Sequence, residues 1–407
     1  MEEQGSGQRL TGRGRRAMAL IAVALAAIVI SGVAYLHPEL AAIGRPAGPR
    51  VAVVSPSPAP PLLSNDYLST YDFVSPTRGW ALVSQLAQST RFWIFQTRDG
   101  AKHWRIQFTG TTSDVYNGSL QVHFFDADHG FVSLADPLVI YRTSDGGAHW
   151  APMKVPPFVS ASADFSDFMH CWVVGYTGSV TQLVSKLVRT SDGGGTWTVL
   201  PDLPTRPLGG KGGSFSTNLA FRNPLEGWLG GLESPGSPAV YTSIDGGASW
   251  QPHALPMQAQ PPPPGGDGFG QEVSVYLVPG AGVLAVTADE QGNMVGLSSF
   301  DGGSTWRRLP PPPGETTFDS YLFEDTFHWW AMRNGTLFKS SDAGQLWKET
   351  AQQTDEWDYL PGIIDSSHAW ARMVVVFPSS TPPNGTGLAM SSDGGLRWIP
   401  VNVPVPP

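Results

Sequence analysis

An eight-residue pattern occurs seven times in this chain, with 41 to 56 residues between successive copies. In every copy Ser or Thr stands two residues before an aspartate, and tryptophan stands five residues after it. We call each copy an Asp repeat. The aspartates are Asp99, Asp145, Asp192, Asp245, Asp301, Asp342 and Asp393, and the tryptophans are Trp104, Trp150, Trp197, Trp250, Trp306, Trp347 and Trp398. Self-similarity at such a period indicates units that stack or form a ring, because one unit cannot bury its apolar surface alone.

The residue types of the Asp repeat predict a tight turn between two strands. Glycine after aspartate adopts positive φ without steric cost, and the carboxylate can accept hydrogen bonds from N–H groups of its own turn. The preceding hydroxyl can add another bond, and the tryptophan can bury a large apolar surface between units. We therefore interpret these aspartates and tryptophans as structural residues rather than as a carboxylate site or sugar platforms.

A second motif, the A–B motif, repeats with the same period. An aromatic or aliphatic residue is followed seven positions later by another, with a polar turn between them, and each pair precedes one Asp repeat by 12 to 23 residues. The pairs are Phe73/Trp80, Phe124/Phe131, Phe165/Trp172, Phe221/Trp228, Tyr276/Val283, Phe323/Trp330 and Ile363/Trp370. Each unit then reads as strand A, turn, strand B, loop, strand C, Asp repeat and strand D.

Four strands per unit and seven units predict an all-β, seven-bladed β-propeller over residues 65–407. In the first unit, residues 80–83, 92–96 and 104–108 fit strands B, C and D. No sustained helical periodicity follows residue 45. The many Gly (47) and Pro (37) residues suit the numerous turns of such a fold.

The N-terminus predicts a membrane tether. Residues 17–36 contain no charge and, as a helix, would span about 30 Å. Four arginines precede this stretch, so the positive-inside rule keeps residues 1–16 in the cytoplasm and exports the rest. Residues 37–64, rich in Pro and Ala, form the predicted linker. The alternative is a cleaved signal peptide, with Gly32 and Ala34 as the small residues at the cleavage site.

Charge and cysteine content exclude some functions. Residues 65–407 carry 19 basic and 31 acidic residues, because 6 of the 25 basic and 3 of the 34 acidic residues precede them. An acidic body does not attract phosphate backbones, so we expect no nucleic acid partner. The single cysteine, Cys171, allows neither an internal disulfide nor a cysteine zinc site. We predict no cofactor and no metal.

With both motifs in this order, the sequence resembles the Asp-box (BNR-repeat) β-propellers, and among them the photosystem II assembly and stability factor-like family. The segments FVSPTRGW, FFDADHGF and FRNPLEGW carry the likeness, which covers about residues 65–407. The resemblance implies a binding propeller of the assembly-factor type. Photosynthetic members are thought to contact their client through an arginine-rich patch, and this sequence shows no dense arginine cluster.

Asp boxes also occur in glycoside hydrolases, so the alternative function is a sialidase-like or xyloglucanase-like enzyme. The segment FRNP (221–224) is the nearest match to a sialidase motif, but it lies within an A–B motif. Carboxylate pairs for hydrolysis could be proposed among Asp355, Glu356 and Asp358, or between Asp267 and Glu272, although nothing singles them out.

Four A–B turns carry aspartate three residues before histidine, as expected of acid–base pairs or metal ligands. They belong to four different predicted blades, so we interpret them as turn residues and assign no catalytic residue. The pairs are Asp126/His129, Asp167/His170, Asp325/His328 and Asp365/His368.

The leading hypothesis is therefore a non-catalytic, membrane-anchored scaffold that binds a protein or peptide outside the cytoplasm. In a four-stranded meander the A–B turns and the Asp repeats emerge on one face, and the B–C and D–A loops on the other. Most of the length variation falls on the second face, in segments 205–215, 258–269, 310–315 and 377–387. Because variable loops on a rigid scaffold usually carry recognition, we predict that the partner binds the face opposite the Asp repeats.

Overall fold

The structure is a computed structural model, and every strand of it belongs to an antiparallel sheet. It describes residues 63–64, 67–85, 90–112, 120–134, 138–158, 160–179, 182–204, 219–234, 237–257, 273–289, 293–311, 313, 318, 320–333, 336–352, 357–375 and 385–407. The predicted cytoplasmic tail, membrane helix and nearly all of the linker lie outside these residues. Within the described part of the chain, no helix has the length and apolar character needed to cross a bilayer.

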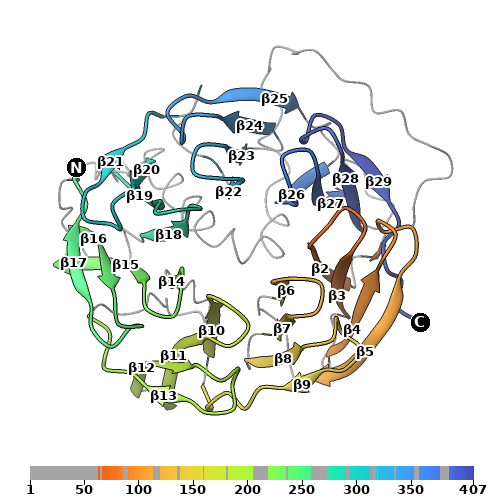
Figure 1. Cartoon of the computed structure of the whole chain (residues 1–407), viewed down its shortest axis with the longest axis horizontal. Coiled ribbons are helices and arrows are strands. Elements are labelled where there is room, and N and C mark those ends of the chain that lie inside the picture. The colour runs from red at the N-terminus through yellow and green to blue at the C-terminus, as the bar shows by residue number, and fades with distance from the viewer. Residues whose placement is uncertain are drawn as a thin grey trace, which may run out of the picture.

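Seven sheets stand around a central axis, and each contains four consecutive strands (Figure 1). Blade 1 contains β2 (Tyr67–Phe73), β3 (Gly79–Gln85), β4 (Thr90–Thr97) and β5 (Arg105–Thr112). Blade 2 contains β6 (Leu120–Phe124), β7 (Gly130–Leu134), β8 (Val139–Thr143) and β9 (Ala151–Pro152). Blade 3 contains β10 (Ser160–Phe165), β11 (Cys171–Ser179), β12 (Gln182–Thr190) and β13 (Thr198–Val199). Blade 4 contains β14 (Leu219–Phe221), β15 (Gly227–Ser234), β16 (Ser237–Ser243) and β17 (Gln251–Ala254).

The second half of the ring repeats this order. Blade 5 contains β18 (Ser274–Leu277), β19 (Val283–Ala288), β20 (Met294–Ser299) and β21 (Arg307–Arg308). Blade 6 contains β22 (Ser320–Phe323), β23 (Trp329–Arg333), β24 (Thr336–Ser340) and β25 (Lys348–Gln352). Blade 7 contains β26 (Trp357–Ile363), β27 (Ala369–Val375), β28 (Gly385–Ser391) and β29 (Ile399–Val401). The first strand of each blade is innermost, and the predicted seven-bladed, all-β propeller is confirmed.

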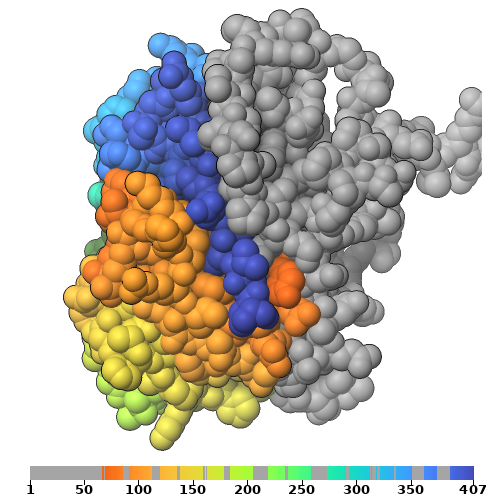
Figure 2. Space-filling view, turned by 90° about the vertical axis from the view of Figure 1, so that its right-hand side faces the viewer, coloured from red at the N-terminus to blue at the C-terminus, as the bar shows by residue number. Residues whose placement is uncertain are grey.

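The ring closes where both ends of the propeller meet blade 7. Strand β1 (Leu63–Ser64), which we had assigned to the linker, pairs with the edge of β28, the same strand that pairs with β29. Beyond β29, Asn402 crosses to blade 1, where its side chain donates to Lys102 O (2.8 Å) and its carbonyl accepts the Trp104 indole N–H (2.9 Å). Figure 2 shows the blue segments of blade 7 against the orange ones of blade 1.

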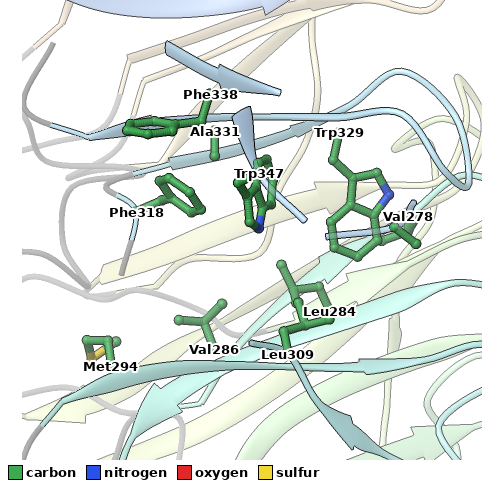
Figure 3. Close-up of a cluster of buried hydrophobic side chains, with 11 residues drawn as sticks. Val278, Leu284, Val286, Met294, Leu309, Phe318, Trp329, Ala331, Phe338 and Trp347 are labelled. Carbon is green, nitrogen blue, oxygen red and sulfur yellow. The ribbon is translucent and has the colours of Figure 1, made fainter. Parts of the chain in front are cut away.

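The core lies between the blades rather than at the centre of the ring. Alternate residues of a strand point to opposite neighbours, as the pleat of a β-strand requires. In β3, Trp80 and Leu82 pack toward blade 2, whereas Ala81 and Val83 pack toward blade 7. Seven such clusters fill the seven interfaces, and Figure 3 shows the one in which Leu284 and Leu309 of blade 5 face Trp329 and Trp347 of blade 6.

The A–B motif supplies the aromatic contacts between neighbouring blades. In blades 1 to 3 its second residue stacks on the first residue of the motif in the next blade. The stacked rings are Trp80 on Phe124 (centroids 3.4 Å apart), Phe131 on Phe165 (3.6 Å) and Trp172 on Phe221 (3.7 Å). In these three blades the repetition of the A–B motif therefore reflects a contact between one blade and the next.

Blade 5 departs from the predicted pair Tyr276/Val283. Leu277 is the register partner of Val283, just as Phe73 is the partner of Gly79 in blade 1. The residues equivalent to Phe73 and Trp80 are therefore Leu277 and Leu284, one position later than we predicted. Both strands are apolar throughout at this point, so the sequence pattern alone could not fix the register.

The Asp-repeat tryptophans pack on the preceding blade, so removing one should measurably lower the stability of the fold. Trp197 of blade 3 packs against the buried cluster between blades 2 and 3, to which Phe131, Ile140 and Met153 of blade 2 belong. We expect Trp197→Ala to lower the free energy of unfolding by about 3–5 kcal/mol, as large-to-small core substitutions do. Denaturant unfolding measures this. Val199→Ala, which alters a side chain that is 64% exposed, is the control. Equal stability of the two variants would contradict the packing role.

Candidate functional site

Each Asp repeat closes its own turn with the same set of hydrogen bonds. In all seven, the Ser or Thr hydroxyl donates to the aspartate Oδ1 (2.7–3.0 Å). The same oxygen accepts the backbone N–H four residues later (2.8–3.0 Å). Donation from the His103 ring and N–H lowers the pKa of Asp99 to about 2. The carboxylates are thus hydrogen-bond acceptors held in seven separate turns.

The backbone of the turn explains the glycines after each aspartate. The two residues that follow the aspartate both have positive φ, for example Gly146 (69°) and Gly147 (91°). Ala101 and Ala343 take this conformation in blades 1 and 6, and they are the non-glycine residues of the described chain with positive φ. Side chains rarely adopt it, which is why glycine predominates there.

The Asp repeats and the A–B turns share one face, which we call the turn face. In six blades the N–H of the residue after the aspartate donates to a carbonyl at the apex of the A–B turn of the same blade, as Gly146 does to Asp128 O (2.8 Å). The B–C and D–A connections lie on the opposite face, which we call the loop face. Segments 205–215 and 258–269, half of 310–315 and most of 377–387 lie outside the described residues, so the predicted partner face stays a prediction.

The four Asp-x-x-His pairs are turn elements of four different blades. In each, the histidine Nδ1 lies 2.8–2.9 Å from a carboxylate oxygen of its own turn. The same aspartate also accepts the histidine backbone N–H (2.8–3.0 Å). These pairs do not converge on one site, and the described residues contain no group of three His, Cys, Asp or Glu side chains that could hold a metal ion.

The segment FRNP is likewise used within the fold. Phe221 stacks on Trp172, and the Arg222 guanidinium donates to Gly282 O of blade 5 (2.5 Å) while lying over the Trp228 ring. Arg142 and Arg189 donate to Asp-repeat carbonyls of the blades that follow them. These three arginines bridge three different interfaces, whereas a sialidase would need three arginines at one pocket.

The proposed hydrolase carboxylates are not placed at a site by the structure. Asp267, Glu272, Asp355 and Glu356 lie outside the described residues, and Asp358 falls within strand β26. A cavity of about 70 Å³ between blades 5 and 6 is lined by Phe318, Tyr321 and Trp347 among others. Ligand pockets usually enclose about 300–1,000 Å³, so this cavity is too small for a sugar substrate.

A row of ionisable residues that we did not predict from the sequence lies on the innermost strands. Asp72, His123 and Asp164 each stand one residue before the first aromatic of an A–B motif, on β2, β6 and β10. His123 Nδ1 lies 3.2 Å from Asp72 Oδ2, and that oxygen accepts the Phe124 N–H (2.6 Å). Asp164 accepts the Phe221 N–H (2.7 Å). Their shared position before the aromatic was the signal that could have identified them.

Asp164 differs from the turn aspartates in its protonation. Burial raises its pKa from 3.8 to about 7, although the hydrogen bonds from Phe221 and Phe165 and the nearby His123 oppose the shift. Ionisable groups with such perturbed pKa values are candidates for functional sites. The Asp164 carboxyl also joins blade 3 to blade 4 by accepting the Phe221 N–H. It therefore stabilises this interface whether or not it belongs to a functional site.

The raised pKa predicts a pH-dependent effect of Asp164→Asn. The unfolded carboxyl ionises near pH 4 and the folded one near 7, so the unfolded state releases its proton first and stability falls as pH rises between these values. We expect Asp164→Asn to raise Tm by about 2–4 °C at pH 8 and to leave it unchanged at pH 4. Asp164→Ala, which removes the acceptor for the Phe221 N–H, should lower Tm at both. A pH-independent effect of Asp164→Asn would contradict the assignment.

Comparison with known proteins supports the fold. No family model matches the sequence, and no curated protein matches it. YCF48 bound to D1 peptide is 16% identical, with a TM-score of 0.50, over 82% of this chain and 99% of that one. YCF48 from Cyanidioschyzon merolae is 16% identical, with a TM-score of 0.52, over 82% of this chain and 98% of that one. A prolyl endopeptidase is 11% identical, with a TM-score of 0.51, over 84% of this chain and 50% of that one.

These structural similarities show a shared propeller fold, and at 11–16% identity they leave activity open. The chain is similar to the photosystem II assembly factor YCF48 over nearly the whole of that protein, so the resemblance predicted from the two motifs is confirmed at the level of the fold.

Proposed function

We propose that this chain is a non-catalytic scaffold that binds a protein or peptide. The main support is that the aspartates and histidines of the Asp-x-x-His pairs, which have the residue types of acid–base groups, form hydrogen bonds within their own turns. Asp126 and Asp167, for example, each hold the ring and the N–H of their own histidine. Such groups stabilise a rigid framework and do not converge on a substrate.

The class of ligand in this proposal, a protein or peptide, is taken from a solved propeller of the same fold. YCF48 has been solved with a D1 peptide, and it covers 82% of this chain. A rigid ring that offers loops and turns around an axis suits the recognition of an extended or folded segment of another protein. The glycoside hydrolase alternative gains no comparable support from the residues of the described chain.

The scaffold is proposed to work at a membrane, outside the cytoplasm. The support is the sequence of residues 17–36, which contains no charge, follows four arginines and precedes a segment rich in proline and alanine. A single-pass anchor with its N-terminus in the cytoplasm would place the propeller on the outer side. The tether is proposed to keep the scaffold close to membrane-bound clients.

Removing the anchor tests this location. Deleting residues 1–37 and supplying another export signal should move the protein from the membrane pellet to the soluble fraction, because the apolar segment would be gone. Fractionation with an antibody against the propeller measures the distribution. Native protein that is free in the supernatant and begins near Tyr35 would show cleavage instead.

Shortening a loop tests the predicted partner face. Replacing residues 258–269 with a tight turn should leave Tm nearly unchanged, because loop length affects stability little, and should weaken capture of the partner in a crosslinking pull-down from membranes. His170→Gln, on the turn face, is the matched control and should capture normally. Loss of capture in the control but not in the loop variant would place the partner on the turn face.

A further inference from the structure

The turn face carries most of the large apolar side chains that the described residues expose. Seven of the twelve lie in A–B turns or Asp repeats, and all seven belong to blades 3 to 7. They are Met169, Leu225, Ile244, Phe300, Phe327, Leu346 and Leu396. Five are concentrated on blades 4 to 6, and we call these the apolar arc: Leu225, Ile244, Phe300, Phe327 and Leu346.

Hydrogen bonds and a side-chain contact join the segments that carry the arc. Leu225 O accepts the Gly246 N–H (2.9 Å), which holds the A–B turn of blade 4 against the repeat that contains Ile244. In blade 5 the Phe300 ring lies over Gly282, where a Cβ would meet it at 3.1 Å. Thr326 Oγ1 donates to Pro279 O (2.9 Å), which joins the turns of blades 6 and 5. The arc therefore spans adjoining turns.

The turn itself does not require these apolar residues. Ile244 and Phe300 occupy the position between the hydroxyl residue and the aspartate, where blades 1 and 2 have Arg98 and Ser144. The hydroxyl-to-carboxylate distances are 2.9 and 2.8 Å in blades 4 and 5, against 3.0 and 2.9 Å in blades 1 and 2. Since either kind of residue supports the same turn, an apolar cluster on one side of the ring needs another explanation.

Most charges within the turns and repeats of blades 4 to 6 are negative, although the Arg189 guanidinium of blade 3 donates to Asp245 O (2.9 Å) and Arg307 and Arg308 follow the repeat of blade 5. The turns and repeats of blades 4 to 6 contain one arginine, Arg222, and six carboxylates: Glu226, Asp245, Asp301, Glu324, Asp325 and Asp342. Arg222 is committed to Gly282 O and the Trp228 ring. The nearby Lys339 ammonium lies 3.9 Å from the centre of the Trp330 ring. An apolar surface framed by carboxylates complements apolar side chains flanked by Lys or Arg.

We infer that the apolar arc docks a basic amphipathic segment of a partner protein. This surface lies opposite the face proposed for the client, so the scaffold would hold two partners at once. The acidic frame disfavours the same face of a second copy, and it disfavours anionic lipid, because both would bring like charges together.

The test measures binding of a defined peptide to the full-length chain in nanodiscs of neutral lipid. The probe is a fluorescent 18-residue amphipathic peptide of Leu and Lys, and its counterpart carries Glu in place of Lys. The arc variant combines Ile244→Ser and Phe327→Ser, at side chains 80% and 59% exposed. The control combines Val199→Ser and Ile399→Ser, at side chains 64% and 54% exposed on outer strands.

We expect the Leu/Lys peptide to bind the arc variant at least about tenfold more weakly than the natural sequence, with the control unchanged. The Leu/Glu peptide should bind at least about tenfold more weakly than the Leu/Lys peptide, and added salt should narrow that difference. All variants are expected to melt at the same temperature, because these side chains are exposed.

Equal affinity of the arc variant and the natural sequence would overturn the inference. So would preferential binding of the Leu/Glu peptide, or a self-association of the natural sequence that the arc variant abolishes, since that would make a second copy the occupant. Deleting residues 258–269 should leave peptide binding intact. The two proposals can fail separately. If the peptide binds through the arc but no membrane client is captured, this inference stands and the proposed function fails.

Discussion

One carbonyl oxygen in each of several Asp repeats ties a blade to the one before it. Positive φ at the glycine after the aspartate turns this oxygen away from its own turn. Gly146 O accepts the Trp80 indole N–H (3.1 Å) and the Gln96 amide (2.9 Å) of blade 1. Gly246 O likewise accepts from Trp172 (2.9 Å) and Arg189 (3.1 Å) of blade 3. A single backbone conformation thus forms the turn and joins two sheets through the tryptophan of the A–B motif in the preceding blade.

That arrangement divides the residues of the turn face into two kinds. The aspartate, the hydroxyl residue before it and the glycines are fixed by their bonds. The position between the hydroxyl residue and the aspartate is free to vary, because its side chain takes no part in those bonds, and it is Arg98, Ser144, Ile244 or Phe300 in different blades. Residues with a binding function on this face are therefore to be sought at the variable positions, because the repeated residues are already engaged in the hydrogen bonds that hold the turn.

The same division explains how far the sequence could predict the molecule. Local, repeated chemistry fixed the number of blades and the position of each turn, because Asp99 and Trp104 mark a turn wherever their pattern occurs. Contacts between blades were harder to predict, because they join residues that are far apart in the sequence. Asp72, for example, accepts the N–H of Phe124, 52 residues later. Neither the raised pKa of Asp164 nor its contact with Phe221 follows from any local motif. The register that we predicted for blade 5 was wrong because its strands are apolar on both faces.

Closure of the ring also determines where the proposed membrane tether would join the propeller. Without a disulfide, the ring depends on β1 and β29 sharing the edge of β28, and on Asn402 joining blade 1. Strand β1 lies on the outer edge of blade 7, so the chain enters the propeller at the perimeter. An entry point at the perimeter leaves the mouths of the central channel unobstructed by β1 itself. A scaffold that holds one partner on the loop face and another on the turn face would need this placement, because a tether that entered at either mouth would compete with a partner.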